Sequence, residues 1–551
     1  MADQVRIARM GIFPKVSPPV FGISAALILG FILFGSLFTE TAKTLFTGAQ
    51  DVITVHFGWF FIILVNAILV LCLYLAFGRY GDIRLGKQTE EPEYKLVSWS
   101  AMLFSAGIGI GLLYWGTAEP LFHFFSPPLT AAESQRAASE AMVFAFLHWG
   151  FHGWAVYILV ALSLAYFHFR RGLPLAPRSG LFPLIGNRIY GPIGHTVDIL
   201  AVFGTMFGIV TSLGLGVMQI SGGLNHVFGT PDTTWMQVTI IAFITALATV
   251  SVFLGLDKGI KRISNFNIIL SMVMLAFVIA VGPTLFIFDS YVENIGNYLH
   301  ALVERSFWNE AYSGGDWQGT WTIFYWAWWV SWSPFVGIFI ARISRGRTIR
   351  EFVLGVLLIP CAILFLWFTA FGGTAIHMEL NGNPGLIEAT QEDYGNAVFK
   401  LIEFFPMSNV LAVVIMVMIV VWFVTSSDSG SFVIDMLTAG GDRDPPKIQR
   451  IFWATTEGAV AAVLLVAGGL NALQAAAVVA GFPFAFVLIA LAWGLMRALG
   501  RDKLILYRQE QLYRSAEEVE VNTPSAIKHW EDTAPEPRTA PRGDAVPAPA
   551  E

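Results

Sequence analysis

The sequence predicts an all-α polytopic membrane protein with twelve transmembrane helices. Of its 551 residues, 55% are hydrophobic and only 13% are charged, a balance too apolar for a soluble protein of this length. Apolar runs long enough to cross a bilayer recur along the whole chain, and Lys and Arg stay out of their interiors. The net charge of −6 belongs to loops and the C-terminal tail, so no nucleic-acid partner is expected.

The apolar runs define the twelve expected spans in order. The first is as long as a full span, so no cleavable signal is expected. Between the seventh and eighth spans, residues 290–312 carry apolar side chains at helical spacing, which indicates an amphipathic helix along the membrane surface. The spans are expected near residues 19–38, 57–78, 96–115, 138–167, 195–225, 236–256, 264–288, 319–342, 351–375, 408–431, 450–469 and 472–496.

Basic residues predict the orientation of these spans. Only four of the 33 Lys and Arg residues fall in the loops of one side, namely Lys43, Arg136, Arg305 and Lys400. Since Lys and Arg concentrate in cytoplasmic loops, the opposite, basic side is expected to be cytoplasmic and to carry both termini. Past Gly500 we expect a short charged helix over 501–515, and disorder from about Ala516, where Pro, Ala, Glu and Asp accumulate.

The run Trp326–Phe335 is the first candidate for a binding site. It holds four tryptophans within seven residues and then Ser333-Pro334, which is expected to interrupt the helix. Trp321, Tyr325, Trp328 and Trp332 share a stripe at helical spacing, and Trp329 points about 100° away. Tryptophan faces attract cations without donor hydrogens, such as quaternary ammonium groups. The alternative is an aromatic belt at the membrane interface, but belts lie at span ends and this run enters the span.

Span four offers a second aromatic wall. Trp149, Trp154 and Tyr157 fall within an arc of about 140° on a helix. His148 and His152 are four residues apart, a spacing that can bind a metal, but no third ligand is evident nearby. We therefore expect these histidines to bond to neighbouring helices. Because no set of nucleophile, base and metal is recognisable, an intramembrane enzyme is not expected.

The glycines of span three, Gly107, Gly109 and Gly111, weaken its helix. They are compatible with close helix packing, or with an unwound point whose carbonyls can bind a cation. If five-span halves repeat as spans 3–7 and 8–12, spans three and eight correspond, and paired interruptions indicate the central site of a transporter.

Span ten supplies oxygen atoms for a cation. The hydroxyls of Thr425 and Ser426, with freed carbonyls of span three, would form an all-oxygen site suited to a hard cation such as sodium. Alternatively, these hydroxyls bond back to their own helical turn. Asp428 and Glu119 are the notable acids in or beside spans, and for Asp428 a functional role and a helix-packing role both remain open. Cys72 and Cys361 lie in separate spans and are expected to be buried thiols.

Together these motifs resemble the betaine/choline/carnitine transporter family, over all twelve predicted spans. The resemblance rests on Trp326–Phe335 with the following 337–351, on 107–111 with Gly116–Pro120, and on Thr425–Asp428. It implies two inverted five-helix repeats of the LeuT type, usually in a homotrimer, in a bacterial inner membrane. The implied organisation is a tail (1–18), two extra helices (19–95), the first repeat (96–288), an amphipathic linker (289–318), the second repeat (319–496) and a C-terminal tail (497–551).

The resemblance also implies site residues. The solute would lie among Trp149, Trp154, Tyr157 and Trp329, with Trp328 nearby and with Trp332 and Phe335 toward the outer path; a solute carboxylate would meet the backbone at Gly107 and Gly109. One sodium would use the carbonyls around Ser105 and Ile108 with Thr425 and Ser426, and a second would use Thr205 and the neighbourhood of Phe335.

The chain departs from the family pattern at two places. Ile108 replaces a usual Met, and Ile209 replaces a second Thr, which leaves the second sodium dependent on nearby Thr211 and Ser212. Gly111 stands where proton-coupled choline carriers tend to have Asp, and no Lys or Arg lies where sodium-independent exchangers place one. We therefore expect a sodium-coupled importer of glycine betaine or dimethylsulfoniopropionate without a cofactor. The alternatives are a proton-coupled choline carrier and a carnitine-type exchanger.

Overall fold

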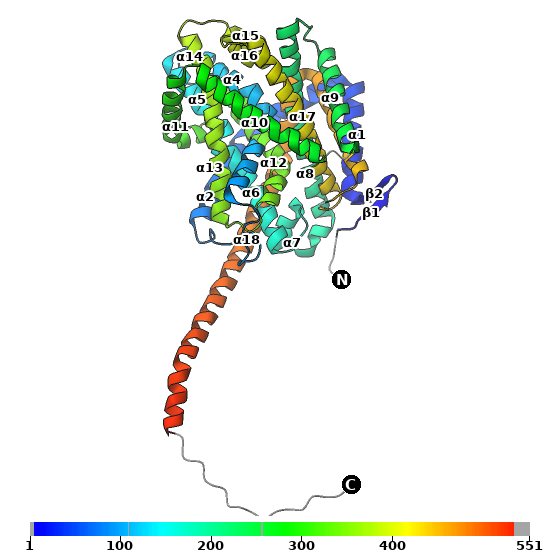
Figure 1. The fold of residues 1–551 in the computed structure, drawn as a ribbon. Coiled ribbons are helices and arrows are strands. Elements are labelled where there is room, and N and C mark those ends of the chain that lie inside the picture. The colour runs from blue at the N-terminus through cyan, green and yellow to red at the C-terminus, as the bar shows by residue number, and fades with distance from the viewer. Residues whose placement is uncertain (1–4, 108, 255–256, 443, 534–551) are drawn as a thin grey trace, which may run out of the picture. The chain divides into compact units, whose positions relative to one another are not determined.

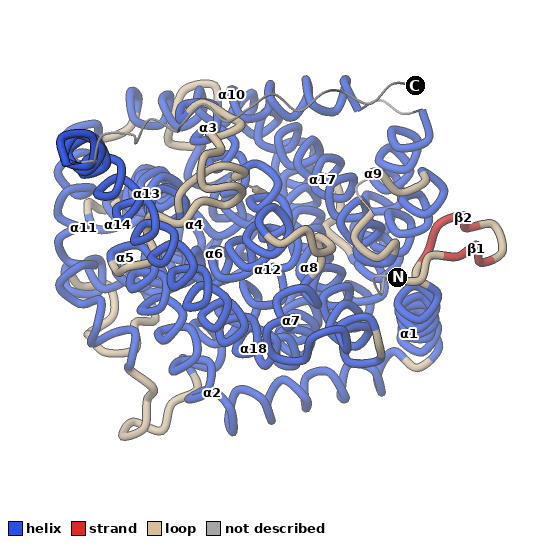
Figure 2. Tube along the Cα trace, turned by 90° about the horizontal axis from the view of Figure 1, so that it is seen from below, coloured by secondary structure: helices blue, strands red, loops and turns tan. Residues whose placement is uncertain are grey.

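Helices form nearly the whole described chain (Figures 1 and 2). The computed structural model describes residues 5–107, 109–254, 257–442 and 444–533. It divides into two units, 1–496 and 497–551, each considered separately. A short hairpin of β1 (Ala8–Met10) and antiparallel β2 (Phe13–Val16) precedes the first helix and lies beside it (Figure 2).

The helices follow one another with short connections. The α-helices are α1 (Pro18–Leu37), α2 (Thr39–Phe77), α3 (Leu96–Gly107), α4 (Ile110–Phe125), α5 (Gln135–Trp149), α6 (Phe151–Ala165), α7 (Phe182–Ile185), α8 (Pro192–Phe228), α9 (Thr234–Leu254), α10 (Asp257–Val281), α11 (Thr284–Phe307), α12 (Phe324–Ile343), α13 (Ile349–Phe368), α14 (Thr374–Leu380), α15 (Leu386–Glu392), α16 (Ala397–Ile402), α17 (Ser408–Thr438) and α18 (Lys447–Thr533). Short 3-10 or π segments are η1 (Tyr166–Arg170), η2 (Pro177–Leu181), η3 (Gly186–Tyr190), η4 (Gly319–Ile323), η5 (Thr369–Gly373) and η6 (Tyr394–Asn396).

The helices are those of a multi-pass membrane protein. Within the described residues, ten helical stretches are long and apolar enough to cross a bilayer. The sequence predicted twelve spans. The third is divided here between α3 and α4, each too short to be counted alone, and α18 covers the last two, with Gly468 and Gly469 in non-helical conformations between them. The number twelve stays a prediction.

The interruption of span three is found where the glycines predicted it. Helix α3 ends at Gly107 and α4 begins at Ile110, and Gly109 between them is extended, with φ −164° and ψ −172°. Ile108 lies outside the described residues.

The predicted interruption at Ser333-Pro334 is wrong, because α12 continues through Pro334. Proline has no N–H, so it cannot bond the carbonyl four residues earlier, that of Val330. The Ser333 hydroxyl donates to this carbonyl at 2.7 Å and takes the place of the missing donor. A neighbouring hydroxyl thus satisfies the freed carbonyl, as membrane helices with internal proline require.

The predicted disorder beyond Ala516 is also wrong for the described part of the tail. Helix α18 continues to Thr533. Residues 501–520 lack Gly and Pro and are rich in Leu, Arg, Glu and Gln, which have high helix propensity.

Burial distinguishes central from peripheral helices. Within an apolar window of 18 residues, 94% of the residues are buried in the α5–α6 stretch and 83% in the stretch containing α12, whereas 28% are buried in α9 and in α10. Helix α12 packs against α6 and α8, and α17 packs against α8. These four helices, with the α4–α5 pair, form the core that positions the candidate site.

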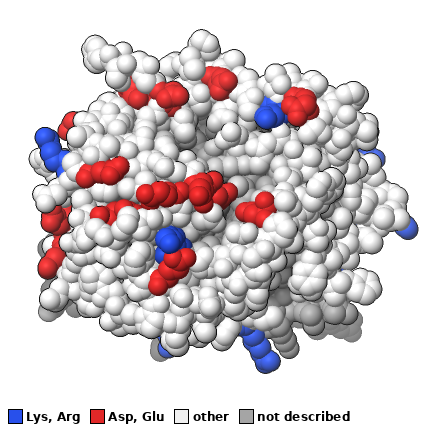
Figure 3. Space-filling model, turned by 90° about the horizontal axis from the view of Figure 1, so that it is seen from above, with Lys and Arg blue, Asp and Glu red and all other residues white. Residues whose placement is uncertain are grey.

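The two ends of the first unit differ in charge. Viewed from the end that carries α14, α15 and α16, the surface shows many Asp and Glu side chains and few Lys or Arg (Figures 1 and 3). The hairpin and α7 lie at the opposite end (Figure 1). The distribution agrees with the asymmetry of basic residues in the sequence.

An ion pair without solvent contact fixes the start of α8. Arg178 Nε lies 2.5 Å from Asp198 Oδ2, and both side chains are fully buried. Removing one partner leaves the other charge buried and unpaired, so we expect Arg178→Ala to lower the free energy of unfolding by about 3–5 kcal/mol. Thermal unfolding in detergent measures this loss. Exposed Arg188→Ala is the control and should unfold like the wild type; equal melting temperatures for the two variants would contradict the assignment.

Candidate functional site

Five aromatic side chains surround one small cavity, and we call them the cage. They are Trp149 at the end of α5, Trp154 and Tyr157 on α6, and Trp329 and Trp332 on α12. Gly153 and Leu364 complete the lining, and the cavity measures about 20 Å³. The members of the cage are at most 6% exposed, except for the partly exposed Trp332. The site is therefore almost dry and presents aromatic faces.

The cage rings meet mainly at steep angles. The ring centroids of Trp149 and Trp329 lie 5.0 Å apart, with the ring planes at 70°. The ring centroids of Trp154 and Tyr157 lie 5.6 Å apart, with the planes at 90°. Tyr157 also lies within 6.4 Å of Trp329 and Trp332. Edge-to-face contacts of this kind are favourable, and they leave ring faces directed to the cavity.

Two glycines allow the tryptophans to come this close. A Cβ on Gly153 would lie 2.9 Å from Cδ1 of Trp329, and a Cβ on Gly111 would lie 3.1 Å from both Trp149 and Trp328. A side chain at either position would displace a ring. Because glycine has no side chain, α4 and α6 can approach the tryptophan rings closely at these two positions.

Trp328 and Phe335 lie beside the cage and do not line its cavity. The Trp328 indole donates to the carbonyl of Gly208 on α8 at 3.1 Å, so it backs the cage. Trp328 and Trp329 stack at 4.8 Å, although neighbouring residues on a helix point in different directions. Phe335 stacks on Trp332 at 6.0 Å.

A second pocket, of about 170 Å³, adjoins the cage through Trp332. Its oxygen-bearing lining brings together Thr425 and Ser426 of α17, Ser212 of α8 and the backbone at Gly109. The Thr425 hydroxyl donates to the Val421 carbonyl at 2.9 Å, which leaves its lone pairs available. We call this the oxygen pocket; its chemistry suits a hard cation.

For the other predicted cation ligands, only Thr205 and nearby Thr211 have described side chains. Ile108 and the side chain of Ser105 lie outside the described residues, and Gly107 contributes the end of α3. Thr205 does not line the oxygen pocket; its hydroxyl is fully buried and has no partner among the described residues. The Thr211 hydroxyl donates to the Leu473 carbonyl, which makes it a packing contact to α18.

A third pocket, of about 480 Å³, extends the oxygen pocket toward basic residues. The two share Phe335, Phe339 and Ser429, and the third is also lined by Arg342, Arg345 and Arg450. Asp428 lies here and pairs with Arg450 at 3.4 Å, which favours the structural interpretation of this acid. Trp332 lines the oxygen pocket and Phe335 lines both this and the third pocket, on the part of α12 that leads to the basic loop after it; their expected placement toward the outer path stays a prediction.

Toward the acidic end, an aromatic layer covers the cage. Trp115, Phe122 and Trp321 pack together, and Tyr394 of η6 closes over Trp115 at 5.3 Å and Phe122 at 5.9 Å. Trp115 and Trp321 are at most 3% exposed. The cage, the oxygen pocket and the third pocket follow one another toward the basic residues after α12.

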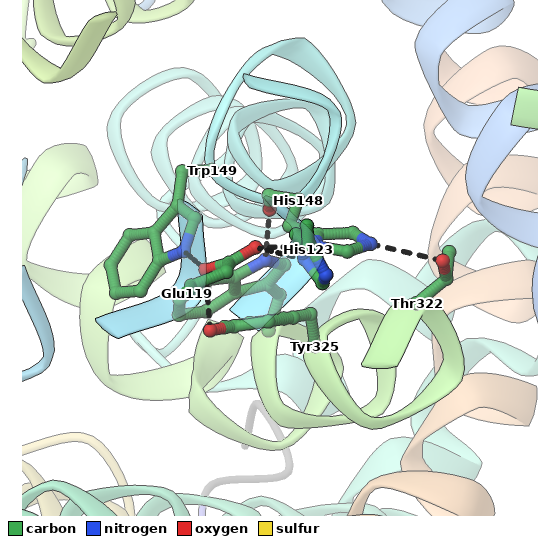
Figure 4. Close-up of polar contacts among 7 residues, drawn as sticks. Glu119, His123, His148, Trp149, Thr322 and Tyr325 are labelled. Carbon is green, nitrogen blue, oxygen red and sulfur yellow. Dashed lines mark hydrogen bonds and ion pairs between the residues drawn. The ribbon is translucent and has the colours of Figure 1, made fainter. Parts of the chain in front are cut away.

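A buried carboxyl lies behind the cage (Figure 4). Glu119 Oε2 accepts hydrogen bonds from the Trp149 indole at 2.7 Å and the Tyr325 hydroxyl at 2.6 Å. Glu119 Oε1 lies 2.6 Å from His148 Nδ1, and His148 Nε2 lies 2.9 Å from the Thr322 hydroxyl. His123 is more distant from Oε1, at 3.4 Å. We call Glu119, His148, Trp149 and Tyr325 the carboxyl network.

Glu119, His123 and His148 also have the composition of a metal site, and their ligand atoms lie within 4.8 Å of one another. Two ligand atoms on a tetrahedral zinc lie about 3.3 Å apart, given metal–ligand bonds of about 2.0 Å. The 2.6 Å between Glu119 and His148 instead indicates a shared proton. The geometry thus favours a hydrogen-bond network.

The sequence did not predict these neighbours of His148. The paired histidines do not act together: His152 bonds to Asn66 at 3.1 Å and stacks on Trp326 at 5.1 Å. This agrees with the expected bonds to neighbouring helices. The expectation that no third ligand type lies near His148 is wrong, because Glu119 and His123 come from another helix. The only available signal was the intramembrane position of Glu119 itself. Cys72 and Cys361 are free and buried, as expected.

Comparison with known proteins gives consistent results. The profile of the betaine/carnitine/choline family transporters, BCCT, matches residues 19–504. The chain is 44% identical to a glycine betaine transporter of Acinetobacter baylyi over 89% of this chain and 74% of that protein. It is 42% identical to the glycine betaine transporter OpuD of Bacillus subtilis, over 90% and 96% of the two chains.

A third relative has a broader printed specificity. It is a glycine betaine/proline/choline transporter of Vibrio parahaemolyticus, 43% identical over 87% of this chain and 89% of that protein. A solved structure of a Na+-coupled sialic acid symporter aligns with 78% of this chain and 86% of its own, at 14% identity. Its TM-score of 0.39 is too low to establish a shared fold.

The pockets predict one-sided access to the oxygen pocket. We expect a cysteine at Ser426 to react with a membrane-impermeant maleimide applied from the basic-loop side, because Ser426 lines the oxygen pocket. Ser427→Cys is the matched control: its side chain is buried and bonded to Glu457 at 2.8 Å. Labelling of oriented vesicles measures both rates. Faster labelling of Ser426→Cys from the acidic side would contradict the described path.

Proposed function

The chain belongs to the betaine/carnitine/choline transporter family, and from this we propose that it imports a small onium solute, glycine betaine first, by sodium-coupled alternating access. The observation that carries the solute class is the cage, in which five aromatic rings enclose one cavity. An onium head has no N–H to donate, so it is recognised by ring faces through cation–π attraction. The named relatives support glycine betaine among onium solutes.

Polar atoms at the cage suit the other end of a zwitterion. Tyr157 and Trp332 line the cage cavity, and the Tyr157 hydroxyl and the Trp332 indole N–H are buried without a partner among the described residues. Buried donors without partners are costly, so a solute carboxylate that accepts from them would offset that cost. The extended backbone at Gly109 lies farther along, in the oxygen pocket.

Sodium coupling rests on the oxygen pocket. Thr425, Ser426 and Ser212 bring three hydroxyls to one space that shares Trp332 with the cage. A sodium ion bound there would stabilise the position of Trp332, which also lines the cage. Each sodium moved across the membrane contributes about 2.3 kcal/mol per 100 mV of potential, which suffices for strong accumulation.

Proton coupling of the choline-carrier type has less support. The resemblance places an acid of those carriers at Gly111, where even a Cβ would lie 3.1 Å from Trp149 and Trp328. A larger side chain there would require both rings to move. Choline itself stays open as a solute, because the cage recognises the onium head.

The membrane arrangement follows from charge and pockets. We place both termini and the basic loops in the cytoplasm of a bacterium, with the acidic end outside. The path from the cage to Arg342 and Arg345 then belongs to an inward-open conformation, closed outside by the aromatic layer. Twelve spans, inverted repeats and a homotrimer belong to the same proposal.

The cage is tested by a tryptophan pair on one helix. We expect Trp329→Ala to reduce the apparent affinity for glycine betaine by at least about tenfold, since it removes a cation–π face and opens the cavity. Trp326→Ala is the matched control, because Trp326 is equally buried on α12 but stacks on His152. Uptake of labelled solute into proteoliposomes measures both, and equal loss in the two variants would contradict the cage.

The oxygen pocket is tested by removing one hydroxyl. Thr425→Val keeps the shape of the side chain, and we expect it to raise the sodium concentration for half-maximal uptake by about tenfold, as for loss of one good ligand. Thr438→Val is the control on the same helix, where the hydroxyl bonds back to the carbonyls of Ile434 and Asp435 in its own turn. An unchanged sodium dependence in Thr425→Val would remove this residue from the cation site.

A further inference from the structure

We propose that Glu119 is a positioning residue that sets the solute affinity of the cage. The inference rests on the proposed function, because it takes the cage as the place where the solute binds. Glu119 lies on α4 and does not line the cage cavity. It acts through Trp149 and Trp329, which do.

The first link is direct. Glu119 Oε2 accepts from Trp149 Nε1 at 2.7 Å and from the Tyr325 hydroxyl at 2.6 Å, both at buried atoms. Holding the indole N–H fixes the plane of the Trp149 ring. In that orientation the ring centroids of Trp149 and Trp329 lie 5.0 Å apart, and both residues line the cavity.

The second link runs through His148. Its ring is held at both nitrogens, by Glu119 Oε1 at 2.6 Å and by the Thr322 hydroxyl at 2.9 Å. The backbone carbonyl of the same residue accepts from Trp329 Nε1 at 2.7 Å. Fixing His148 therefore fixes the end of α5 against α12 and, with it, the second tryptophan.

A carboxyl is suited to this position because it offers several acceptor sites in one small group. Trp149 and Tyr325 each bring a donor that has no water to bond in this fully buried place. An unsatisfied donor would cost about 1–3 kcal/mol, enough to turn the ring toward another acceptor. Because Trp149 and Trp329 face the solute, such a turn changes affinity.

The test separates positioning from charge. Glu119→Ala removes every acceptor, and we expect KM for glycine betaine to rise by about tenfold or more with a much smaller change in kcat. Glu119→Gln should restore a KM close to the wild type. Its amide oxygen can accept from Trp149 and Tyr325, while its NH2 donates to His148 Nδ1. His148 then carries its proton on Nε2 and donates to the Thr322 hydroxyl. A Gln variant as weak as the Ala variant would overturn positioning by hydrogen bonds.

A matched control is available on α5. Glu140 is also a buried acid, but it bonds Thr130 at 2.8 Å and pairs with Arg305, away from the cage. Glu140→Ala should leave KM unchanged. A KM rise equal to that of Glu119→Ala would mean that loss of any buried acid loosens the protein, and would overturn the proposal.

Two further measurements keep the result interpretable. If Glu119→Ala fails to fold, Tyr325→Phe removes one hydroxyl only, and we expect about a threefold rise in KM because the carboxyl loses one of its fixed donors; an unchanged KM would contradict the proposal. Near-ultraviolet circular dichroism reports tryptophan orientation without solute, and its signal should weaken in Glu119→Ala and persist in Glu119→Gln. The circular dichroism result is valid even if the wild-type protein transports no onium solute. Absence of transport by the wild type would contradict the proposed function alone.

Discussion

The hydrogen bonds that converge on Glu119 join the parts of the site that must keep a fixed geometry. One carboxyl holds side chains from α5 and α12 while it sits on α4, and it does so where no water can replace a lost bond. Two tryptophans of the cage depend on it, one directly and one through the His148 carbonyl. The acceptor that orients the cage tryptophans thus lies outside the cavity. Among the residues that line the cavity, Tyr157 and Trp332 carry the hydroxyl and the indole N–H that we propose to meet the solute.

Three local features of the sequence shape the surroundings of the site. The Ser333 hydroxyl bonds the Val330 carbonyl that Pro334 cannot bond, and α12 continues through Pro334. The glycines at 111 and 153 remove the side chains that would separate the rings. Helix α4 begins after an extended Gly109, which brings the Gly109 backbone to the oxygen pocket.

The sequence predicted the helical membrane class, the interruption at 107–110 and the aromatic residues that the structure gathers at one cavity, because each is a local pattern of composition or spacing. It did not predict the partners of Glu119, since these come from helices far apart in the chain. The sequence also predicted a break at Pro334. This failed because the Ser333 hydroxyl bonds the carbonyl that the proline leaves free, and no sequence pattern indicates that bond. The direction of the path past Trp332 likewise depends on which helices leave a pocket open.

The aromatic cage and the oxygen pocket share Trp332, so the binding of solute and the binding of sodium should be coupled. The most direct measurement is the uptake of labelled glycine betaine into proteoliposomes, with the inward sodium gradient replaced by an equal potassium gradient at the same membrane potential. The account predicts that accumulation collapses when sodium is absent and returns when it is restored. Accumulation that persists in potassium, driven by internal solute or by a pH step, would contradict sodium coupling and the assignment of the oxygen pocket.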